Sequence, residues 1–507
     1  MLLKSNADNW LNFKKLGFML LICVLLGVFS SLFPFETAAT IFIAIGTLVT
    51  TIIIIKKPFV IVLFLTIFIP FEDFVIKFIP VSDPIQLALR LMSELLIYST
   101  LTVTILKKMI QGKSIRLTRL EHWLIIFIFA GIFSSLLNSA SLGSSIINLR
   151  AIIRYIFLFY LLVNLNLSPK QNQKLLNAIL AIGAVQIIIG AIQIITRGSI
   201  NSFLLPTQTN IEIAGVSRGA VLLNRGREIG SIFGTLGDTI FLALFLLIVL
   251  VIFLGKNNLL RLKTLAIIAI LFGAINYTFA RGVVLAALFA VILYAIIYYG
   301  KNRLVIGSIL GVPFAILAIY TLVASSAIYR DFNNPLFEEI GILDNFTGIL
   351  TIDYFERAQN QRLGALIGIP PTVLANAPAF GFGLDESLTV SKLNESNPSY
   401  MLREIDQNGF EDVYWTAILS YTGLLGLLSF AMIFTLIGRK AKQIFRKAKH
   451  KQTKQLAAIV LCLTVLTAFL LFFYRVVEFR AFSYYYWLLA GLMLSSYIQE
   501  KARLRNL

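Results

Sequence analysis

Hydrophobic side chains occur along the chain in long blocks that short polar segments separate. The blocks have about 16 to 25 residues, the length that crosses roughly 30 Å of hydrocarbon as an α-helix. Because a lipid-embedded backbone must satisfy its own hydrogen bonds, this pattern predicts an all-α membrane protein. We expect fourteen spans, near residues 16–34, 39–55, 59–79, 85–106, 123–138, 146–165, 176–196, 235–255, 264–279, 283–299, 304–325, 413–437, 455–474 and 483–499.

One of these spans has a weaker pattern than the others. The apolar core of span 59–79 ends at Pro70, and Glu72, Asp73 and Lys77 follow within the same block. Charged side chains are costly inside a bilayer. This segment is therefore either a full crossing or a dip into the membrane from one side.

The composition agrees with a polytopic membrane protein. Of the 507 residues, 58% are hydrophobic and 14% are charged, and the mean hydropathy is +0.85. Soluble proteins are closer to half apolar and a quarter charged. A soluble enzyme, a disordered tail and a secreted disulfide scaffold are excluded. Both cysteines, Cys23 and Cys462, lie in hydrophobic blocks, so no disulfide framework or thiolate metal site is indicated.

The basic residues set the expected orientation. With the N-terminus inside, the inner segments hold 28 basic and 3 acidic residues, and the remainder holds 16 basic and 22 acidic ones. Under the positive-inside rule this asymmetry places both termini in the cytoplasm. The first span is expected to be retained, because no small-residue cleavage site follows it cleanly. The net charge of +19 then reflects insertion, and no nucleic-acid partner is expected.

The spans and loops divide the chain into three expected parts. Residues 1–325 form an N-terminal bundle of about eleven spans, and residues 413–507 form a three-span part with a basic cytoplasmic loop. Between them, residues 326–412 form a large extracytoplasmic loop, in which residues 352–368 have the pattern of an amphipathic helix on the membrane. A long ordered loop of this kind is more often functional than a plain connection.

Arginine is unusually frequent outside the inner segments. Of the 16 basic residues there, 14 are Arg, the exceptions being Lys77 and Lys392. The guanidinium group binds phosphate or carboxylate with two parallel hydrogen bonds and keeps its proton when desolvated. The pattern favours an anionic ligand near the outer membrane surface. The alternative is that these arginines only neutralise the outer carboxylates.

Three polar segments are candidates for chemistry at that surface. Residues 224–238 carry Arg225 and Arg227 ahead of a span, and Arg281 is followed by Gly282 at the tip of a tight helical hairpin. Glu411 and Asp412 precede another span, where a helix N-terminus stabilises the charged carboxylate. The alternatives are an interfacial arginine and a simple helix cap.

Four charged residues are predicted inside the membrane. Arg90 and Glu94 are four residues apart on span 85–106, and Arg150 and Arg154 are four apart on span 146–165. Buried charges must be paired or line a polar cavity. Glu94 is a candidate partner for Arg154, so either a structural ion pair or a ligand pocket is expected.

Together these segments resemble the superfamily of O-antigen ligases and O-antigen polymerases, which are bacterial membrane glycosyltransferases. The resemblance covers about residues 220–430. It rests on Arg227–Phe233, Thr278–Gly282, Arg362 ahead of Pro378–Gly383, and Thr422–Gly426. Ala280 replaces the family's usual Ser, and Asp412 lies where ligases have a His. The latter departure indicates the polymerase branch.

The resemblance implies transfer or polymerisation of an oligosaccharide from undecaprenyl diphosphate to a glycan acceptor, outside the plasma membrane of a bacterium. It implies Asp412 or Glu411 as the base, and an inverting reaction without a cofactor. The diphosphate would bind Arg227, Arg281 and Arg362, with Arg225 and Arg357 as further candidates. A metal-assisted variant would use Glu404 and Asp406. A polysaccharide flippase or a chain-length regulator is an expected partner.

Other functions fit parts of the same pattern. A transporter of an anion or a lipid-linked sugar would use Arg90, Glu94, Arg150 and Arg154 as its pathway and would not need the large loop. A weaker alternative is that the loop is an assembly surface for an export complex. Within the enzyme class, a protein O-glycan ligase and a wall-polymer ligase are alternatives, because loop shape determines the acceptor.

Overall fold

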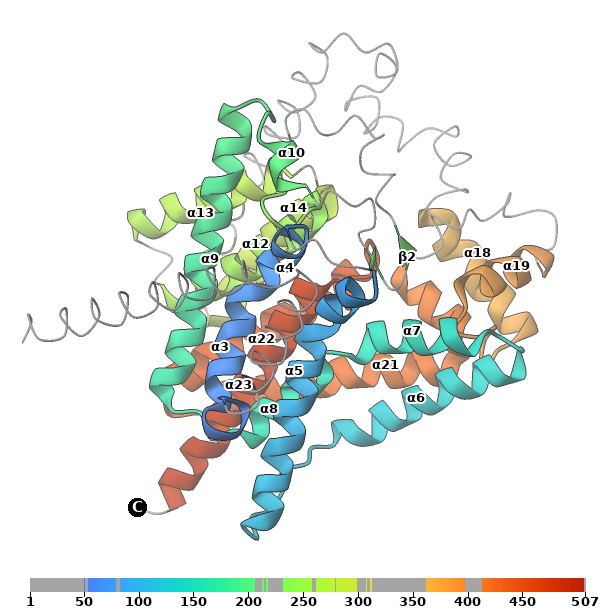
Figure 1. The fold of residues 1–507 in the computed structure, drawn as a ribbon, viewed down its shortest axis with the longest axis horizontal. Helices are drawn as coiled ribbons and strands as arrows, with labels where there is room; N and C mark the ends of the chain where they lie inside the picture. The colour runs from blue at the N-terminus through green and yellow to red at the C-terminus, as the bar shows by residue number, and fades with distance from the viewer. Residues whose placement is uncertain are drawn as a thin grey trace, which may run out of the picture. The chain divides into compact units, whose positions relative to one another are not determined.

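The computed structural model describes most of the chain between residues 50 and 505 (Figure 1). The described residues are 50, 53–78, 83–205, 212–213, 216–217, 231–257, 261–278, 280–298, 307, 311, 362–396 and 413–505. For residues 83–88, 212–213, 216–217, 281 and 362–364 the description covers the backbone alone. The chain packs as two compact units, residues 1–61 and 62–507, and the contacts below lie within the second.

The described chain is almost entirely helical, which confirms the predicted all-α class. The helices are α3 (Pro58–Phe68), the short 3-10 helix η1 (Ile69–Phe71), α4 (Glu72–Ile76), α5 (Asp83–Ile110), α6 (Leu120–Leu137), α7 (Leu142–Ile153), α8 (Ile156–Asn164), α9 (Pro169–Ile195), α10 (Asn201–Leu204), α12 (Thr239–Lys256), α13 (Leu262–Asn276), α14 (Arg281–Tyr298), α18 (Arg362–Asn376), α19 (Glu386–Glu395), α21 (Tyr414–Lys447), α22 (Lys451–Leu470) and α23 (Arg480–Arg505). Strands β1 (Glu212–Ile213) and β2 (Val216–Ser217) form one short antiparallel pair, with Glu212 opposite Ser217.

Seven helical segments in the described part of the chain are long and apolar enough to cross a membrane, or eight if the bent pair of α7 and α8 is one span. They are Pro58–Ile76, Leu89–Ile110, Leu120–Leu137, Pro169–Ile195, Thr239–Lys256, Tyr414–Lys447 and Lys451–Leu470. Helices α13 and α14 are apolar but shorter, and α23 is not among the seven. The predicted spans 16–34, 39–55 and 304–325 lie wholly or largely outside the described residues. These helices agree with the predicted membrane-spanning architecture by their length and composition, and the number fourteen and the topology stay predictions.

Span 146–165 differs from the straight helix that the sequence predicts. It consists of α7 and α8, which meet at an angle of 45° across Arg154 and Tyr155. The Arg154 guanidinium donates to the backbone carbonyl of Glu478. Because a buried guanidinium must find acceptors, the break lets the Arg154 side chain reach a polar group that a continuous apolar helix would not offer.

The amphipathic helix predicted at residues 352–368 lies mostly outside the described residues. Residues 352–361 lie outside the description, and α18 runs from Arg362 to Asn376 with Pro370 and Pro371 inside it. Proline usually interrupts a helix because it lacks an N–H group. Adjacent prolines in the third turn are tolerated here, and the carbonyl of Gly368 accepts a hydrogen bond from the Thr372 hydroxyl.

Helix α23 is buried although its composition is partly polar. Its tyrosines bury aromatic rings and place their hydroxyls on neighbouring helices: Tyr484 bonds to Val62, Tyr485 to Thr66, and Tyr486 to Thr464. A buried tyrosine is favourable when its hydroxyl has a partner. The apolar helix α12 is buried on nearly all sides, as expected for a helix without a polar face.

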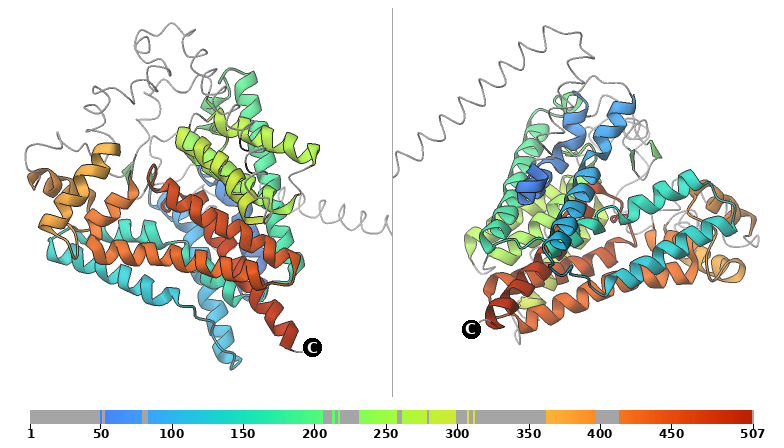
Figure 2. Two further views of the ribbon diagram at one scale, coloured as in Figure 1. Left: turned by 180° about the vertical axis from the view of Figure 1, so that it is seen from behind. Right: turned by 60° about the horizontal axis from the view of Figure 1, so that its bottom comes forward.

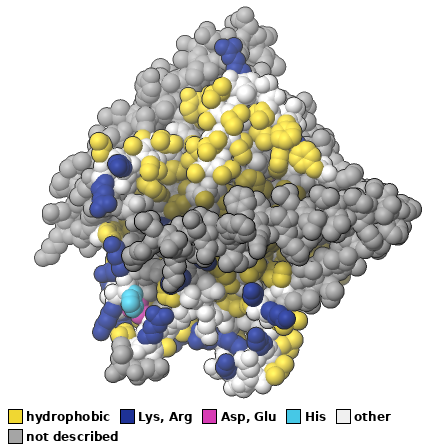
Figure 3. Space-filling model, turned by 60° about the vertical axis from the view of Figure 1, so that its left-hand side comes forward, with side chains coloured by type: hydrophobic (Ala, Val, Ile, Leu, Met, Phe, Trp, Pro, Cys, Tyr) yellow, Lys and Arg dark blue, Asp and Glu magenta, His cyan; other side chains and the backbone are white. Residues whose placement is uncertain are grey.

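Segments that the sequence places on one side of the membrane contact one another. On the predicted inner side, the Lys108 ammonium donates to Asn164 (2.8 Å) and the Gln499 amide donates to the carbonyl of Leu167 (2.7 Å). On the predicted outer side, the Thr235 hydroxyl donates to the carbonyl of Pro70 (2.7 Å). Figure 3 shows hydrophobic side chains across the middle and upper part of one described face, with most Lys and Arg side chains in its lower part.

Glu500 joins the predicted inner ends of α21 and α23, and its replacement gives a first prediction. One carboxylate oxygen accepts the backbone N–H groups of Lys449 (2.5 Å) and His450 (3.1 Å). Burial opposes ionisation, but these hydrogen bonds and that of Thr453 lower the pKa of Glu500 below its ordinary value of 4.5. Glu500→Ala should reduce the free energy of unfolding by about 1.5–3 kcal/mol at pH 7.

The pH dependence of this effect follows from the lowered pKa. The stabilisation is present above pH 4.5, the ordinary value, and is lost as the pH falls through the lower pKa of the folded state. Denaturant unfolding in detergent at pH 7, 5 and 3.5 measures it. Glu395→Ala, on the exposed part of α19, is the control and should change little at any pH. An equal loss for Glu500→Ala at every pH would contradict the assignment.

Candidate functional site: a charged pocket

The residues predicted to bind the diphosphate and to act as the base are not described with side chains. Glu411, Asp412, Arg225, Arg227 and Arg357 lie outside the described residues, as do Glu404 and Asp406. Arg281 and Arg362 are described by their backbone alone, as the first residues of α14 and α18. These roles stay predictions.

The structure brings together three of the four charged residues predicted inside the membrane. Both oxygens of the Glu94 carboxylate accept hydrogen bonds from Arg150, at 2.7 and 2.8 Å, and Arg154 Nη1 lies 3.5 Å from the same carboxylate. Glu94 is 2% exposed and Arg154 is 5% exposed. The pairing of Arg150 with Glu94 has the two-bond geometry that holds a buried carboxylate firmly.

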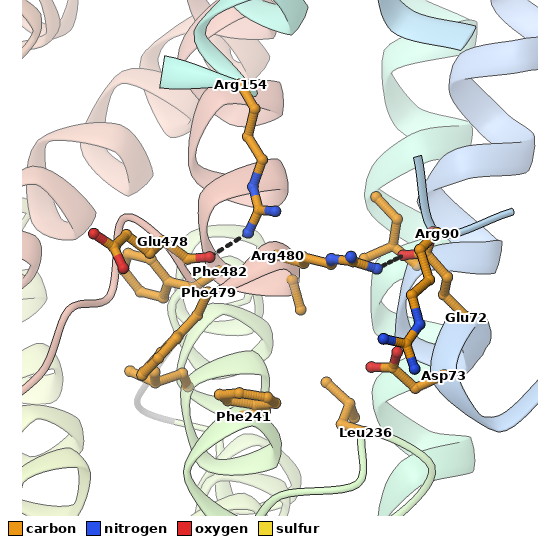
Figure 4. Close-up of a pocket in the computed structure, with 13 residues that line it drawn as sticks. Glu72, Asp73, Arg90, Arg154, Leu236, Phe241, Glu478, Phe479, Arg480 and Phe482 are labelled. Atoms are coloured by element: carbon orange, nitrogen blue, oxygen red, sulfur yellow. Dashed lines mark hydrogen bonds and ion pairs between the residues drawn. The ribbon is translucent and has the colours of Figure 1, made fainter. Parts of the chain in front are cut away.

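Arg154 and Arg90 also line a charged pocket between helices, shown in Figure 4. The pocket is partly open to solvent, and its cavity volume is about 40 Å³. Its polar lining comes from α4, α5, the junction of α7 and α8, and the start of α23. Its apolar lining comes from η1, from α12 and the segment before it, and from the start of α23. The lining residues are Ile69, Glu72, Asp73, Arg90, Arg154, Leu236, Phe241, Leu244, Glu478, Phe479, Arg480, Ala481 and Phe482.

Most charged groups around the pocket are paired. Arg480 lies 3.3 Å from Glu72, which is 1% exposed. Glu478 accepts a hydrogen bond of 2.6 Å from the Tyr414 hydroxyl and lies 3.6 Å from Arg475. Burial raises the pKa of the Glu478 carboxyl above its ordinary value, while Arg475 and the Tyr414 hydroxyl act in the opposite direction.

Some buried donors beside the pocket have no hydrogen-bond acceptor among the described residues. They are Nε of Arg154 and the hydroxyl of Ser483, whereas Nη1 of Arg480 faces Glu72 in the ion pair. A buried donor without an acceptor costs about 1–3 kcal/mol, so such groups usually meet water or a ligand. Phosphate or carboxylate oxygens are suited to them, because they accept several hydrogen bonds and carry the opposite charge.

Asp73 and Arg90 differ from the other charged groups of the pocket. Both are half-buried, and neither side chain forms a hydrogen bond or an ion pair with another described residue. In Figure 4 the two side chains extend toward each other from α4 and α5, beside the pair of Arg480 and Glu72. They are therefore the charged groups of this pocket that a ligand could reach without breaking a pair within the described part of the chain.

Sequence reasoning missed part of this cluster. Glu72 and Asp73 counted only as a weakness of span 59–79, and Arg475, Glu478 and Arg480 were not singled out. One signal was present: three charged residues stand within six positions of an otherwise apolar connection between α22 and α23. Carboxylates and guanidiniums in such a setting mark a functional or paired site.

Segments that adjoin the predicted site residues reach the described structure close to this pocket. Leu236, from the motif that begins with Arg225 and Arg227, lines it. Tyr414, two residues after Asp412, donates its backbone N–H to Leu471 and its hydroxyl to Glu478. Gly282 packs against Tyr474, where an added Cβ would lie 2.9 Å from the ring.

Two motifs of the predicted resemblance are hydrogen-bonded to each other. Backbone N–H groups of Phe382 and Gly383 donate to Ser420 and Tyr421, and those of Leu424 and Leu425 donate to Pro378 and Ala379. Helix α21 is interrupted there at Gly423, which has φ 63°. Helices α6, α7 and α21 run side by side at this end (Figures 1 and 2), and Asn138 of the α6–α7 turn donates to Gly381.

Among the described residues, no group of three or more His, Cys, Asp or Glu side chains is arranged to hold a metal ion. In comparison with known proteins, no family model matched the chain, and no curated protein sequence matched it either. The chemistry of the pocket and the motifs described above therefore carry the functional argument.

Proposed function

We propose that this protein is a membrane glycosyltransferase that transfers or polymerises undecaprenyl-diphosphate-linked oligosaccharides on the extracytoplasmic face of the bacterial plasma membrane. The observation that carries the proposal is the pocket lined by Arg90, Arg154 and Arg480, in which Nε of Arg154 has no acceptor among the described residues. A lipid-linked diphosphate offers oxygens that accept hydrogen bonds from such donors.

The predicted topology supports the location of this pocket. Under the orientation set by the basic residues, α4, the start of α5, the start of α7, the start of α12 and the connection between α22 and α23 all belong to the outer side. The pocket draws most of its lining from α4, α5, α12 and the connection between α22 and α23, and Arg154 reaches it from the junction of α7 and α8, deeper in the predicted span. A donor anchored in the outer leaflet presents its diphosphate at that depth, so the lipid chain can stay in the bilayer while the glycan faces the periplasm.

The chemistry follows from the charges. As the glycosidic bond breaks, negative charge grows on the diphosphate, and guanidiniums held in place by a protein stabilise that charge without reorganising. We assign this role to Arg281, Arg227 and Arg362, together with the pocket arginines. A carboxylate must accept the proton of the attacking hydroxyl, and attack opposite the leaving group inverts the anomeric centre.

A transporter of lipid-linked sugars or anions is the second candidate, and the pocket itself favours it, because a charged cavity between helices is also a typical substrate pathway. The two functions differ in their product. A transporter moves its substrate unchanged, whereas the enzyme forms a new glycosidic bond.

The test is incubation of the purified protein in nanodiscs with undecaprenyl-diphosphate oligosaccharide and an acceptor glycan. A ladder of products indicates a polymerase, and a single added unit indicates a ligase.

Arg281→Gln should lower the rate by about 10²–10³-fold, because it removes a donor that stabilises developing charge. Arg197→Gln, in the turn after α9 and outside the motifs, is the matched control and should keep the wild-type rate. Movement of intact substrate across vesicles without a new bond would overturn the enzyme proposal.

A further inference from the structure

We propose that Asp73 is the carboxylate that takes the proton from the acceptor hydroxyl, and that Arg90 binds the departing diphosphate beside it. This inference rests on the proposed glycosyltransferase function and assigns two of its roles to residues of the pocket. It names a base different from Asp412 and Glu411, so the two assignments can be separated by experiment.

Asp73 is the carboxylate of the pocket that is available to act as a base. A general base must be within reach of the hydroxyl, and its acceptor oxygens must not be occupied. Glu72 is 1% exposed and paired with Arg480, while Glu94 is held by Arg150 and Arg154. Glu478 is bound to Tyr414, and in Figure 4 its carboxylate lies on the side away from Asp73. Among the described carboxylates of the pocket, Asp73 is the accessible one.

Arg90 is placed to bind an anion beside Asp73. Its guanidinium reaches the pocket from α5 and points toward Asp73 in Figure 4, and it forms no ion pair with another described residue. A planar guanidinium can bind a phosphate group with two hydrogen bonds. A phosphate group bound to Arg90 would lie next to Asp73, whose carboxylate could then act on the acceptor hydroxyl.

The pocket also has apolar lining residues. Leu236, Leu244 and Phe241 line the pocket, and the centroid of the Phe241 ring is 4.8 Å from that of Phe479. Apolar walls exclude water and lower the local dielectric constant, so the attraction between a guanidinium and a phosphate becomes stronger. They also provide a flat surface against which a sugar ring or the first part of a lipid chain could pack.

The proposed step is a displacement at the anomeric carbon of the donor. The acceptor hydroxyl oxygen forms a bond to the anomeric carbon of the donor, and the bond from that carbon to the diphosphate oxygen breaks. The electron pair of the broken bond stays on the diphosphate, where Arg90 offsets the added negative charge. The hydroxyl proton moves to an oxygen of Asp73, which later releases it to water.

The experiment compares the wild-type protein with Asp73→Asn, Asp73→Glu and Arg90→Lys in the nanodisc assay. Asp73→Asn keeps the shape of the side chain and should lower kcat by about 10²–10⁴-fold with little change in donor binding, because it removes the proton acceptor. Asp73→Glu should recover part of this loss. Arg90→Lys should mainly raise the KM for the donor. Asp385→Asn, at the N-cap of α19 where Asn serves as well as Asp, is the matched control.

The pH profile distinguishes a base from a structural residue. In the wild type, kcat should rise with pH along the titration of one carboxylate, and Asp73→Asn should lose that limb. Thermal melting and size-exclusion chromatography establish that each variant is folded. If wild-type protein makes product and Asp73→Asn retains its kcat and its acid limb, the assignment of Asp73 is wrong while the enzyme proposal stands. If the wild type itself makes no product and only moves substrate, the proposed function fails first.

Discussion

Replacing Glu94 by glutamine should lower the free energy of unfolding by about 3–5 kcal/mol, the cost of breaking a buried ion pair from one side. The Glu94 carboxylate receives two hydrogen bonds from Arg150 and faces Arg154, which is 5% exposed. Without its charge, Arg154 remains buried with the carbonyl of Glu478 as an acceptor. A carbonyl dipole compensates a full positive charge only in part.

The companion variant Arg150→Gln should have a smaller effect. Its side chain is 32% exposed, so water can replace much of the lost interaction, and Glu94 keeps Arg154 as a partner. Reversible unfolding in mixed micelles, followed by tryptophan fluorescence, measures both variants and their combination. The double variant should be less destabilised than the sum of the single ones, because the two residues interact directly. A loss below about 1 kcal/mol for Glu94→Gln would mean that the Glu478 carbonyl, rather than Glu94, holds Arg154.

The positions of the individual helices could be predicted from the sequence where apolar blocks are long and free of charge. Helices α6, α12 and α22 lie at Leu120–Leu137, Thr239–Lys256 and Lys451–Leu470, and the predicted spans were 123–138, 235–255 and 455–474. An uninterrupted apolar block leaves the backbone one stable conformation in lipid, so composition alone identifies the helix. The starts and ends could not be predicted as closely, because helices such as α21 (Tyr414–Lys447) continue beyond the apolar block into a basic segment.

The bend between α7 and α8 could not be predicted in the same way. The sequence shows that Arg154 lies in an apolar block, where its burial costs free energy. It does not show which group accepts its hydrogen bonds. The partner is the backbone carbonyl of Glu478, more than 300 positions along the chain. A backbone acceptor leaves no trace in side-chain patterns, so the break appears only when the packing of α8 against α23 is known.

The pocket shows a similar limit. Each charged residue could be recognised as unusual in its own block, but the pairing of Glu72 with Arg480 joins positions about 400 residues apart. Which charges are paired and which stay available depends on distances of a few ångströms. Asp73 and Glu72 are neighbours in the sequence, yet the structure buries one beside Arg480 and leaves the other half-exposed in the pocket. Availability, which decides the chemistry, is therefore a property of the fold.

Gly423→Ala should be the most damaging conservative substitution in α21, with a loss of about 2–6 kcal/mol from backbone strain and overpacking together. Gly423 has φ 63° and ψ −165°, a conformation that is nearly restricted to glycine. A Cβ atom there would lie 2.4 Å from the carbonyl carbon and oxygen of Ala379. These are backbone atoms, so no side-chain rotation can relieve the contact.

Two other glycines separate the contributions. Gly112 has φ +61° but nothing within 4 Å of an added Cβ, so Gly112→Ala measures the conformational cost alone, about 1–2 kcal/mol. Gly273 lies within α13 with equally open space, and Gly273→Ala should stabilise the helix by about 0.5–1 kcal/mol. Because the N–H groups of Phe382 and Gly383 donate to carbonyls of α21 just before Gly423, only Gly423→Ala should also speed their hydrogen exchange. Equal losses for Gly423→Ala and Gly112→Ala, with unchanged exchange, would show that the close approach of the two motifs contributes nothing to stability.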